Sequence, residues 1–370
     1  MNAPDYDLLS SYAGLLTLAT VSIYIGAHGS LPHPRNADGS RSEEEEVPER
    51  MSSGDAWLFP VIGSATLVGM YAVVKYYGTA WINWFLGWYF ALAGVGAVWK
   101  SSIALARWVL GDVRWKAFDE VTFVVRKGGA GGKTADTLVA LSARTLSLAL
   151  LPLAAVPSAV YTFHARSALL TDVLGLSFCQ NALALLKIDS FRTGCILLAG
   201  LFVYDVWWVF GTEVMVKVAT SLDVPIKLLW PKSLMFAGER GFTMLGLGDV
   251  VVPGIFIALA LRYDHHRAGA PAHSRFAKPY FYAGLTAYVA GLVTTMAVMH
   301  LFGKAQPALL YLSPACIGAF GVTGALRGEL RAAWAWSDEE DGETASAREP
   351  DTAHDGNGAA HGRMGETDSK

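Results

Sequence analysis

Long apolar blocks alternate with short polar segments along most of the chain. A helix needs roughly 17 to 25 apolar residues to cross the hydrocarbon core of a bilayer, and the blocks have about that length. Aromatic residues often stand near the block ends, where the membrane interface favours them. The pattern therefore predicts an all-α polytopic membrane protein with nine transmembrane helices, at residues 9–28, 56–77, 80–99, 138–164, 168–187, 193–216, 243–262, 280–302 and 306–326.

The segments between the blocks divide the chain into three parts. Residues 1–137 would form three helices, with a polar loop at 31–55 and an amphipathic, charged stretch at 100–137. That stretch could extend the third helix or lie on the membrane surface, and the sequence leaves both open. Residues 138–335 would form the other six helices. Residues 336–370 are rich in Asp, Glu, Gly and Ala, a composition typical of a disordered tail.

Lys and Arg are unevenly distributed among these segments. No basic residue precedes the first block, so we expect an uncleaved helix there and not a signal peptide. If the segments alternate across the membrane, 21 Lys and Arg residues fall on one side and seven on the other. Because positive residues concentrate on the cytosolic side, the N-terminus is predicted to be lumenal and the C-terminus cytosolic. Nine membrane-spanning helices, an odd number, likewise place the two termini on opposite sides of the membrane.

The composition excludes several classes of protein. Charged residues make up 16% of the 370 residues, against about 25% in soluble domains. The net charge is −3 and no basic patch interleaves with aromatic residues, so nucleic acid is not an expected partner. The three cysteines lie within predicted helices and show no CxxC or Cys/His ligand spacing. We therefore expect no disulfide framework, no metal site and no cofactor.

Two carboxylates stand inside predicted helices, Asp205 in LFVYDVWWVF and Asp249 in MLGLGDVVVPG. A carboxylate at membrane depth is costly and is a functional candidate for that reason. Two nearby carboxyls in a medium of low dielectric constant share one proton, so one can act as base while the other acts as acid. The pair therefore predicts a shared catalytic centre. An ion transporter or channel could also use such residues, but the chain shows no repeated halves.

The residues around the two aspartates favour a site that opens to backbone and water. Gly246 and Gly248 carry no side chains that would block an approach to Asp249. Tyr204 could donate a hydrogen bond within the site or only pack, and the sequence does not decide between these roles. If the pair acts on a transmembrane peptide, that peptide's helix must first unwind, because its carbonyls are hydrogen-bonded within the helix. We expect part of the segment 220–242, or the backbone preceding Asp249, to pair with the unwound substrate as an added strand.

Three short motifs lie in consecutive late helices of the prediction: Tyr204-Asp205, Gly246-Leu247-Gly248-Asp249 and Pro307-Ala308-Leu309. Together they resemble the signal peptide peptidase family, intramembrane aspartyl proteases related to presenilin. The likeness is nearly continuous from about residue 170 to 330 and weaker over residues 1–169. It implies a presenilin-like fold with the catalytic pair on helices 6 and 7.

The resemblance also implies the reaction, the substrates and the location. Asp205 and Asp249 would activate water to cut transmembrane segments, above all signal-peptide remnants and other type II membrane proteins, in the membrane of the endoplasmic reticulum. A signal-peptide-peptidase-like homologue with other substrates is the nearest alternative. Homo-oligomerisation is left open. The residues that the resemblance assigns to support or to substrate binding are Tyr204, Gly246, Leu247, Gly248, Pro307, Ala308 and Leu309.

Overall fold

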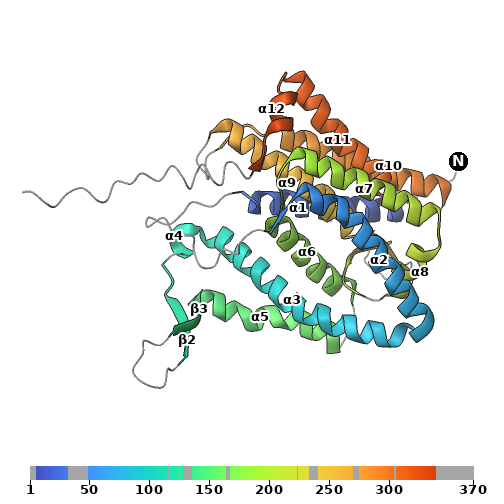
Figure 1. Cartoon of the computed structure of the whole chain (residues 1–370). Helices are drawn as coiled ribbons and strands as arrows, with labels where there is room; N and C mark the ends of the chain where they lie inside the picture. The colour runs from blue at the N-terminus through green and yellow to red at the C-terminus, as the bar shows by residue number, and fades with distance from the viewer. Residues whose placement is uncertain are drawn as a thin grey trace, which may run out of the picture.

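The computed structural model describes residues 6–31, 49–115, 117–127, 136–163, 167–222, 224–232, 241–269, 275–303 and 306–338. Most of these residues lie in helices that run side by side along the molecule (Figure 1). Eight of the described helices are long and apolar enough to cross a membrane: α1 (Tyr6–Gly29), α2 (Ser53–Tyr77), α3 (Thr79–Leu110), α5 (Thr145–Phe163), α6 (Ala168–Leu185), α7 (Phe191–Phe210), α10 (Pro279–Phe302) and α11 (Leu309–Leu326). The short helices are α4 (Asp112–Trp115), α8 (Val214–Ser221) and α12 (Leu330–Ala335).

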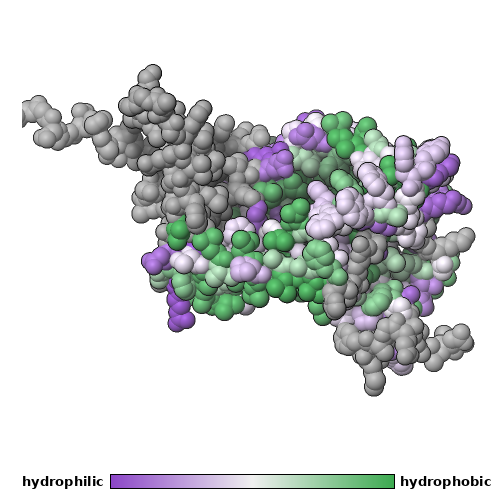
Figure 2. All heavy atoms as spheres, turned by 90° about the horizontal axis from the view of Figure 1, so that it is seen from below, coloured by the Kyte–Doolittle hydropathy of each residue, from purple (hydrophilic) through white to green (hydrophobic). Residues whose placement is uncertain are grey.

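Large apolar side chains cover the outer faces of several helices. Trp57 of α2 is 66% exposed, Trp84 of α3 is 62% exposed and Leu92 of α3 is 75% exposed. Figure 2 shows a broad apolar area on one face of the molecule, with hydrophilic residues gathered toward its edges. Water would disfavour an exposed apolar area of this extent, whereas lipid tails match it. The surface is therefore that of a polytopic membrane protein.

A further long helix, α9 (Gly248–Ala268), lies in the interior of the bundle. It packs against α1, α6, α7, α10 and α11, and every residue from Val252 to Asp264 is buried. At 1.5 Å per residue it is about 32 Å long, enough to cross a bilayer. It carries charged residues such as Arg262 and Asp264, and by hydropathy it does not count among the eight.

Three two-stranded sheets accompany the helices in the described part of the chain. In the first, β1 (Glu49–Met51) pairs in parallel with β4 (Leu186–Ile188). In the second, β2 (Glu120–Lys127) pairs antiparallel with β3 (Asp136–Arg144). In the third, β5 (Lys227–Pro231) pairs antiparallel with β6 (Phe242–Gly246). The all-α prediction is wrong to this extent, and the fold is mostly helical with small sheets.

The structure also corrects three predicted helix boundaries. Residues 138–144 belong to β3 and residues 243–246 to β6, so the helices there begin later than predicted. The helix predicted at 193–216 ends at Phe210, and α8 follows as a separate helix. The first two errors share a cause, because periodicity does not distinguish a short apolar strand from the end of a buried helix.

The predicted polar segments are described only in part. Within 31–55, residues 32–48 lie outside the described residues, and α2 begins after a capping box formed by Ser52 and Asp55. Within 100–137, α3 continues to Leu110 and is followed by α4 and β2, so the third helix does extend into this stretch. Figure 1 shows α4, β2 and β3 at one end of the helix array and α8 at the other. Of the predicted tail, residues 339–370 lie outside the described residues.

Candidate active site

The two aspartates lie on neighbouring helices in the interior of the bundle. Asp205 is on α7 and is 4% exposed, and Asp249 is partly buried in the first turn of α9. The helices α7, α9 and α11 pack against one another (Figure 1). The two carboxyl groups lie within electrostatic range of each other. The structure thus brings together two carboxylates that are 44 positions apart in the sequence.

The start of α11 supplies a backbone donor to Asp205. The N–H of Leu309, the first residue of α11, donates a hydrogen bond of 3.1 Å to Oδ2 of Asp205. The first N–H groups of a helix have no partner within the helix, and the helix dipole favours a negative charge there. Pro307 and Ala308 are buried just before this donor. The motif Pro307-Ala308-Leu309 therefore contacts the motif Tyr204-Asp205 through its backbone.

The Gly246-Leu247-Gly248 segment joins β6 to α9 beside Asp249. Leu247 is 8% exposed, its N–H donates to the carbonyl of Ile226 (3.0 Å), and its own carbonyl accepts from Val251 (2.8 Å). A Cβ atom at Gly246 would lie 3.3 Å from Oδ2 of Asp249, a close contact. A Cβ atom at Gly248 would meet no atom within 4 Å. The first glycine therefore leaves room for the carboxylate, and the second faces open space.

Tyr204 faces a neighbouring helix. A Cβ atom at Gly63 of α2 would lie 3.6 Å from its ring, and the ring of Trp208 is 6.3 Å away. Of the two roles that the sequence left open for Tyr204, these contacts favour packing against α2.

A further polar group near the aspartates has no recognisable signal in the sequence. Tyr288 of α10 is fully buried, and its hydroxyl lies within electrostatic range of Asp249. It stands in the apolar run AYVAGLV, where an isolated tyrosine looks like an ordinary packing residue. No group of three or more His, Cys, Asp or Glu side chains in the described part of the chain could hold a metal ion.

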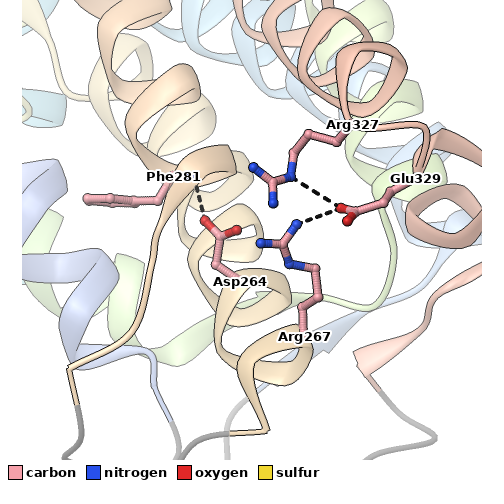
Figure 3. Close-up of polar contacts among 5 residues, drawn as sticks. All are labelled: Asp264, Arg267, Phe281, Arg327 and Glu329. Atoms are coloured by element: carbon pink, nitrogen blue, oxygen red, sulfur yellow. Dashed lines mark hydrogen bonds and ion pairs between the residues drawn. The ribbon is translucent and has the colours of Figure 1, made fainter.

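Polar contacts hold the opposite end of α9. Arg267 donates a hydrogen bond of 2.6 Å to Glu329, and Arg327 lies 3.4 Å from the same oxygen. Asp264 accepts from the N–H of Phe281 (2.9 Å) at the start of α10. Figure 3 shows these side chains joining α9 to the segment that follows α11 and to α10. The hydrogen bond from Arg267 lowers the pKa of Glu329 below its ordinary value.

A second polar contact at this end involves the last residue that the structure describes. Nε of Arg262 lies 3.3 Å from Asp338, and Nη2 of Arg262 donates to the carbonyl of Ile188 (3.0 Å). Arg262 is 3% exposed, so this guanidinium is compensated by a carboxylate and a carbonyl inside the protein. The segment after α11 therefore contacts α9 at two points, Arg262 and Arg267.

Comparison with known proteins gives the same family along most of the chain. Residues 42–340 match the family model described as signal peptide peptidase. The signal peptide peptidase of Homo sapiens is 36% identical over 344 residues, which cover 92% of this chain and 86% of that protein. That of Mus musculus is 38% identical over 327 residues, covering 86% and 81%. A probable intramembrane protease of Schizosaccharomyces pombe is 33% identical over 331 residues, covering 89% and 95%. The chain therefore belongs to the signal peptide peptidase family of intramembrane proteases.

Proposed function

We propose that the protein is an aspartyl endopeptidase that cuts peptide bonds within transmembrane segments, with Asp205 and Asp249 as its catalytic pair. The observation that carries the proposal is the placement of these two carboxyls within electrostatic range on packed helices. We count α9 as a membrane-spanning helix, which makes nine spans and puts the pair on the sixth and seventh.

The pair would work by sharing one proton. The ionised carboxylate takes a proton from water, and the water oxygen attacks the scissile carbonyl carbon while the protonated carboxyl gives its proton to the carbonyl oxygen. The carbon–nitrogen bond then breaks as a proton passes to the leaving nitrogen. The N–H of Leu309 stabilises the carboxylate form of Asp205. This contact favours Asp205 as the member that is ionised before the attack.

The strand preceding Asp249 could hold the unwound substrate. The N–H groups of Leu247 and Lys232 donate to the carbonyls of Ile226 and Gly241, one pair at each end of the hairpin. Because hydrogen-bonded pairs alternate along an antiparallel ladder, Phe242, Met244 and Gly246 direct their N–H and C=O groups away from β5. In the described residues, β6 pairs with β5 alone. Its outer edge could therefore accept a substrate strand that runs toward the aspartates.

The proposed substrates are signal-peptide remnants and other type II transmembrane segments in the endoplasmic reticulum. The human and mouse relatives are named signal peptide peptidases. A remnant has a short apolar core of about 7 to 15 residues, so it spans poorly and unwinds easily. A large lumenal domain would instead collide with the β5–β6 segment, which the positive-charge distribution places on the lumenal side. Removal of that domain should therefore precede cleavage.

Cleavage by the purified protein tests the proposal. The protein in detergent is incubated with a tagged signal peptide, next to the variants Asp205→Ala and Asp249→Ala. We expect cleavage inside the apolar core by the unaltered protein and none by either variant. Cleavage that persists in a variant would refute the aspartyl mechanism. A carboxylate-dependent transporter or channel would cut no peptide at all.

A further inference from the structure

Tyr288 of α10 buries a hydroxyl group without a hydrogen-bond partner. The side chain is 0% exposed, and its oxygen is bonded to none of the residues that the structure describes. An unpartnered hydroxyl in the interior destabilises the fold, because its hydrogen bond to water is lost and not replaced. Phenylalanine would fill the same space without that cost, so the hydroxyl calls for an explanation beyond packing.

Among the described residues, one ionisable group near this hydroxyl is a strong acceptor. The ionisable groups within electrostatic range are Asp249 of α9, Cys179 of α6 and Cys316 of α11. Thiols accept hydrogen bonds only weakly, whereas an ionised carboxylate is acceptor-only and strong. Asp249 in turn accepts no hydrogen bond from the described residues, and the charged group that acts on it is Asp205 of α7. An unused donor and an unused acceptor thus lie near each other in the interior.

We propose that Tyr288 is a positioning residue for Asp249, and that its hydroxyl donates a hydrogen bond to the Asp249 carboxylate that forms when Asp249 gives its proton to the scissile carbonyl. The tyrosine keeps its own proton throughout. The bond would stabilise this carboxylate and hold it at a fixed orientation toward the scissile carbonyl and toward Asp205. This inference rests on the proposed catalytic role of the two aspartates and adds a third helix, α10, to the site.

The same helix supplies a matched control. Tyr280 of α10 is 2% exposed, and its hydroxyl also lacks a partner among the described residues. Its charged neighbours are Arg267, Arg327 and Glu329 at the opposite end of α9, away from Asp249. Tyr280→Phe therefore makes the same chemical change in the same helix at the same burial.

The test compares Tyr288→Phe with Tyr280→Phe in the peptide-cleavage assay over a range of pH. For Tyr288→Phe we expect kcat to fall about tenfold to a hundredfold with KM little changed, the range for a hydrogen bond to a charged group. The high-pH limb of the profile should move about one unit higher, because loss of the donor disfavours the ionised form of Asp249. Its thermal stability should be unchanged or higher. Tyr280→Phe should match the unaltered protein in rate and in profile.

Two results would overturn the proposal: equal behaviour of the two variants, or a lower rate for Tyr288→Phe with an unmoved pH profile. If Tyr288→Phe does not fold, 3-fluorotyrosine at position 288 carries the test, since it keeps the volume and makes a stronger donor. It should then move the profile to lower pH, and an unmoved profile contradicts the proposal. Asp249→Ala is measured beside them. Activity in Asp249→Ala would refute the proposed function itself, whereas an inactive Asp249→Ala with indifferent Tyr288 variants refutes only the positioning role.

Discussion

At the scale of single residues, the contact between Leu309 and Asp205 gives one side chain two roles. The carboxylate is a proposed catalytic group, and it also accepts from the first N–H of α11. An amide side chain can fill the second role but not the first. The two roles can therefore be separated by substitution.

The first prediction separates them at position 205. Asp205→Asn keeps an oxygen that can accept from Leu309, so we expect normal stability with no cleavage. Asp205→Leu leaves that N–H without a partner and should be less stable than Asp205→Asn by about 1–3 kcal/mol. Thermal unfolding in detergent measures the difference. The control is the same pair of substitutions at Asp249, which accepts no such bond from the described residues. An equal difference at both positions would contradict the argument.

The second prediction concerns the two glycines before Asp249. Gly246→Ala places a methyl group 3.3 Å from the Asp249 carboxylate, so the carboxylate must shift by a few tenths of an ångström. Since catalysis is sensitive to such displacements, we expect kcat to fall about tenfold. Gly248→Ala meets no atom within 4 Å in the enzyme alone. Gly248→Ala should leave kcat nearly unchanged, and it should raise KM only if the substrate passes beside Gly248. Equal losses of kcat in both variants would contradict the difference in space around the two glycines.

The residues differ in how far the sequence alone reveals them. Asp205 and Asp249 stand out because a carboxylate in an apolar helix is costly. The donor of Leu309 is a backbone group, which leaves no trace in residue identity. Tyr288 is hidden for another reason, because aromatic residues are common in membrane helices and only its missing partner distinguishes it. The N–H of Leu309 and the side chain of Tyr288 are therefore recognised only from their three-dimensional contacts.

At the scale of elements, the outer edge of β6 gives the third prediction. Met244 is 57% exposed and directs its N–H away from β5, so proline there removes a donor from the outer edge without breaking the β5 ladder. We expect Met244→Pro to fold normally and to raise KM at least tenfold for helical substrates. Met244→Ala keeps the N–H and should bind substrate as the unaltered protein does. Unchanged KM in Met244→Pro would exclude strand addition at this edge.

The fourth prediction concerns the link between α9 and the segment after α11. Because Arg267 lowers the pKa of Glu329, this link stabilises the fold fully above the ordinary Glu value of 4.5 and loses its effect as the pH falls through the lowered value. The unaltered protein should therefore lose thermal stability below about pH 4.5, and Glu329→Gln should lose less. We expect a difference of about 1–3 °C in Tm at neutral pH, since partly exposed ion pairs are weak.

A matched control for this link is Glu213→Gln. Glu213 pairs with Lys217 at 2.8 Å, but both lie at the start of one short helix and connect no separate elements. Its substitution should change Tm less than Glu329→Gln does. If the Tm values of Glu213→Gln and Glu329→Gln change with pH in the same way, the Arg267–Glu329 pair does not contribute to the packing of α9.

The elements also show why the sequence predicts a helix, and not a strand, at residues 243–246. The run from Phe242 to Leu247 is short and apolar, and it continues into a longer apolar block. Its side chains alternate between exposed and buried in the structure, as those of a half-buried strand do. Five residues are too few for this alternation to stand out from the block that follows.

At the scale of the whole molecule, α9 is enclosed by other helices. Lipid does not contact its buried residues, so Arg262 and Asp264 can be held there by Ile188, Asp338 and Phe281 instead of by water. Hydropathy measures how well the side chains of a helix tolerate contact with lipid. A helix that is enclosed by other helices makes no such contact and can therefore be less apolar. This explains why α9 is not one of the eight apolar helices although its length suffices to cross the membrane.

The fifth prediction decides whether α9 crosses. With nine spans, Tyr6 and Arg331 lie on opposite sides of the membrane, whereas eight spans would put both on the lumenal side. Both positions are exposed, so Tyr6→Cys and Arg331→Cys can be labelled with an impermeant thiol reagent in sealed microsomes.

Cys195 is replaced before labelling, because it is only partly buried, while Cys179 and Cys316 are buried. We expect Arg331→Cys to react at once and Tyr6→Cys only after detergent opens the vesicles. Glu213→Cys, which follows α7, should behave as Tyr6→Cys under either count and serves as the control. Labelling of Arg331→Cys only after detergent would mean that α9 does not cross the membrane.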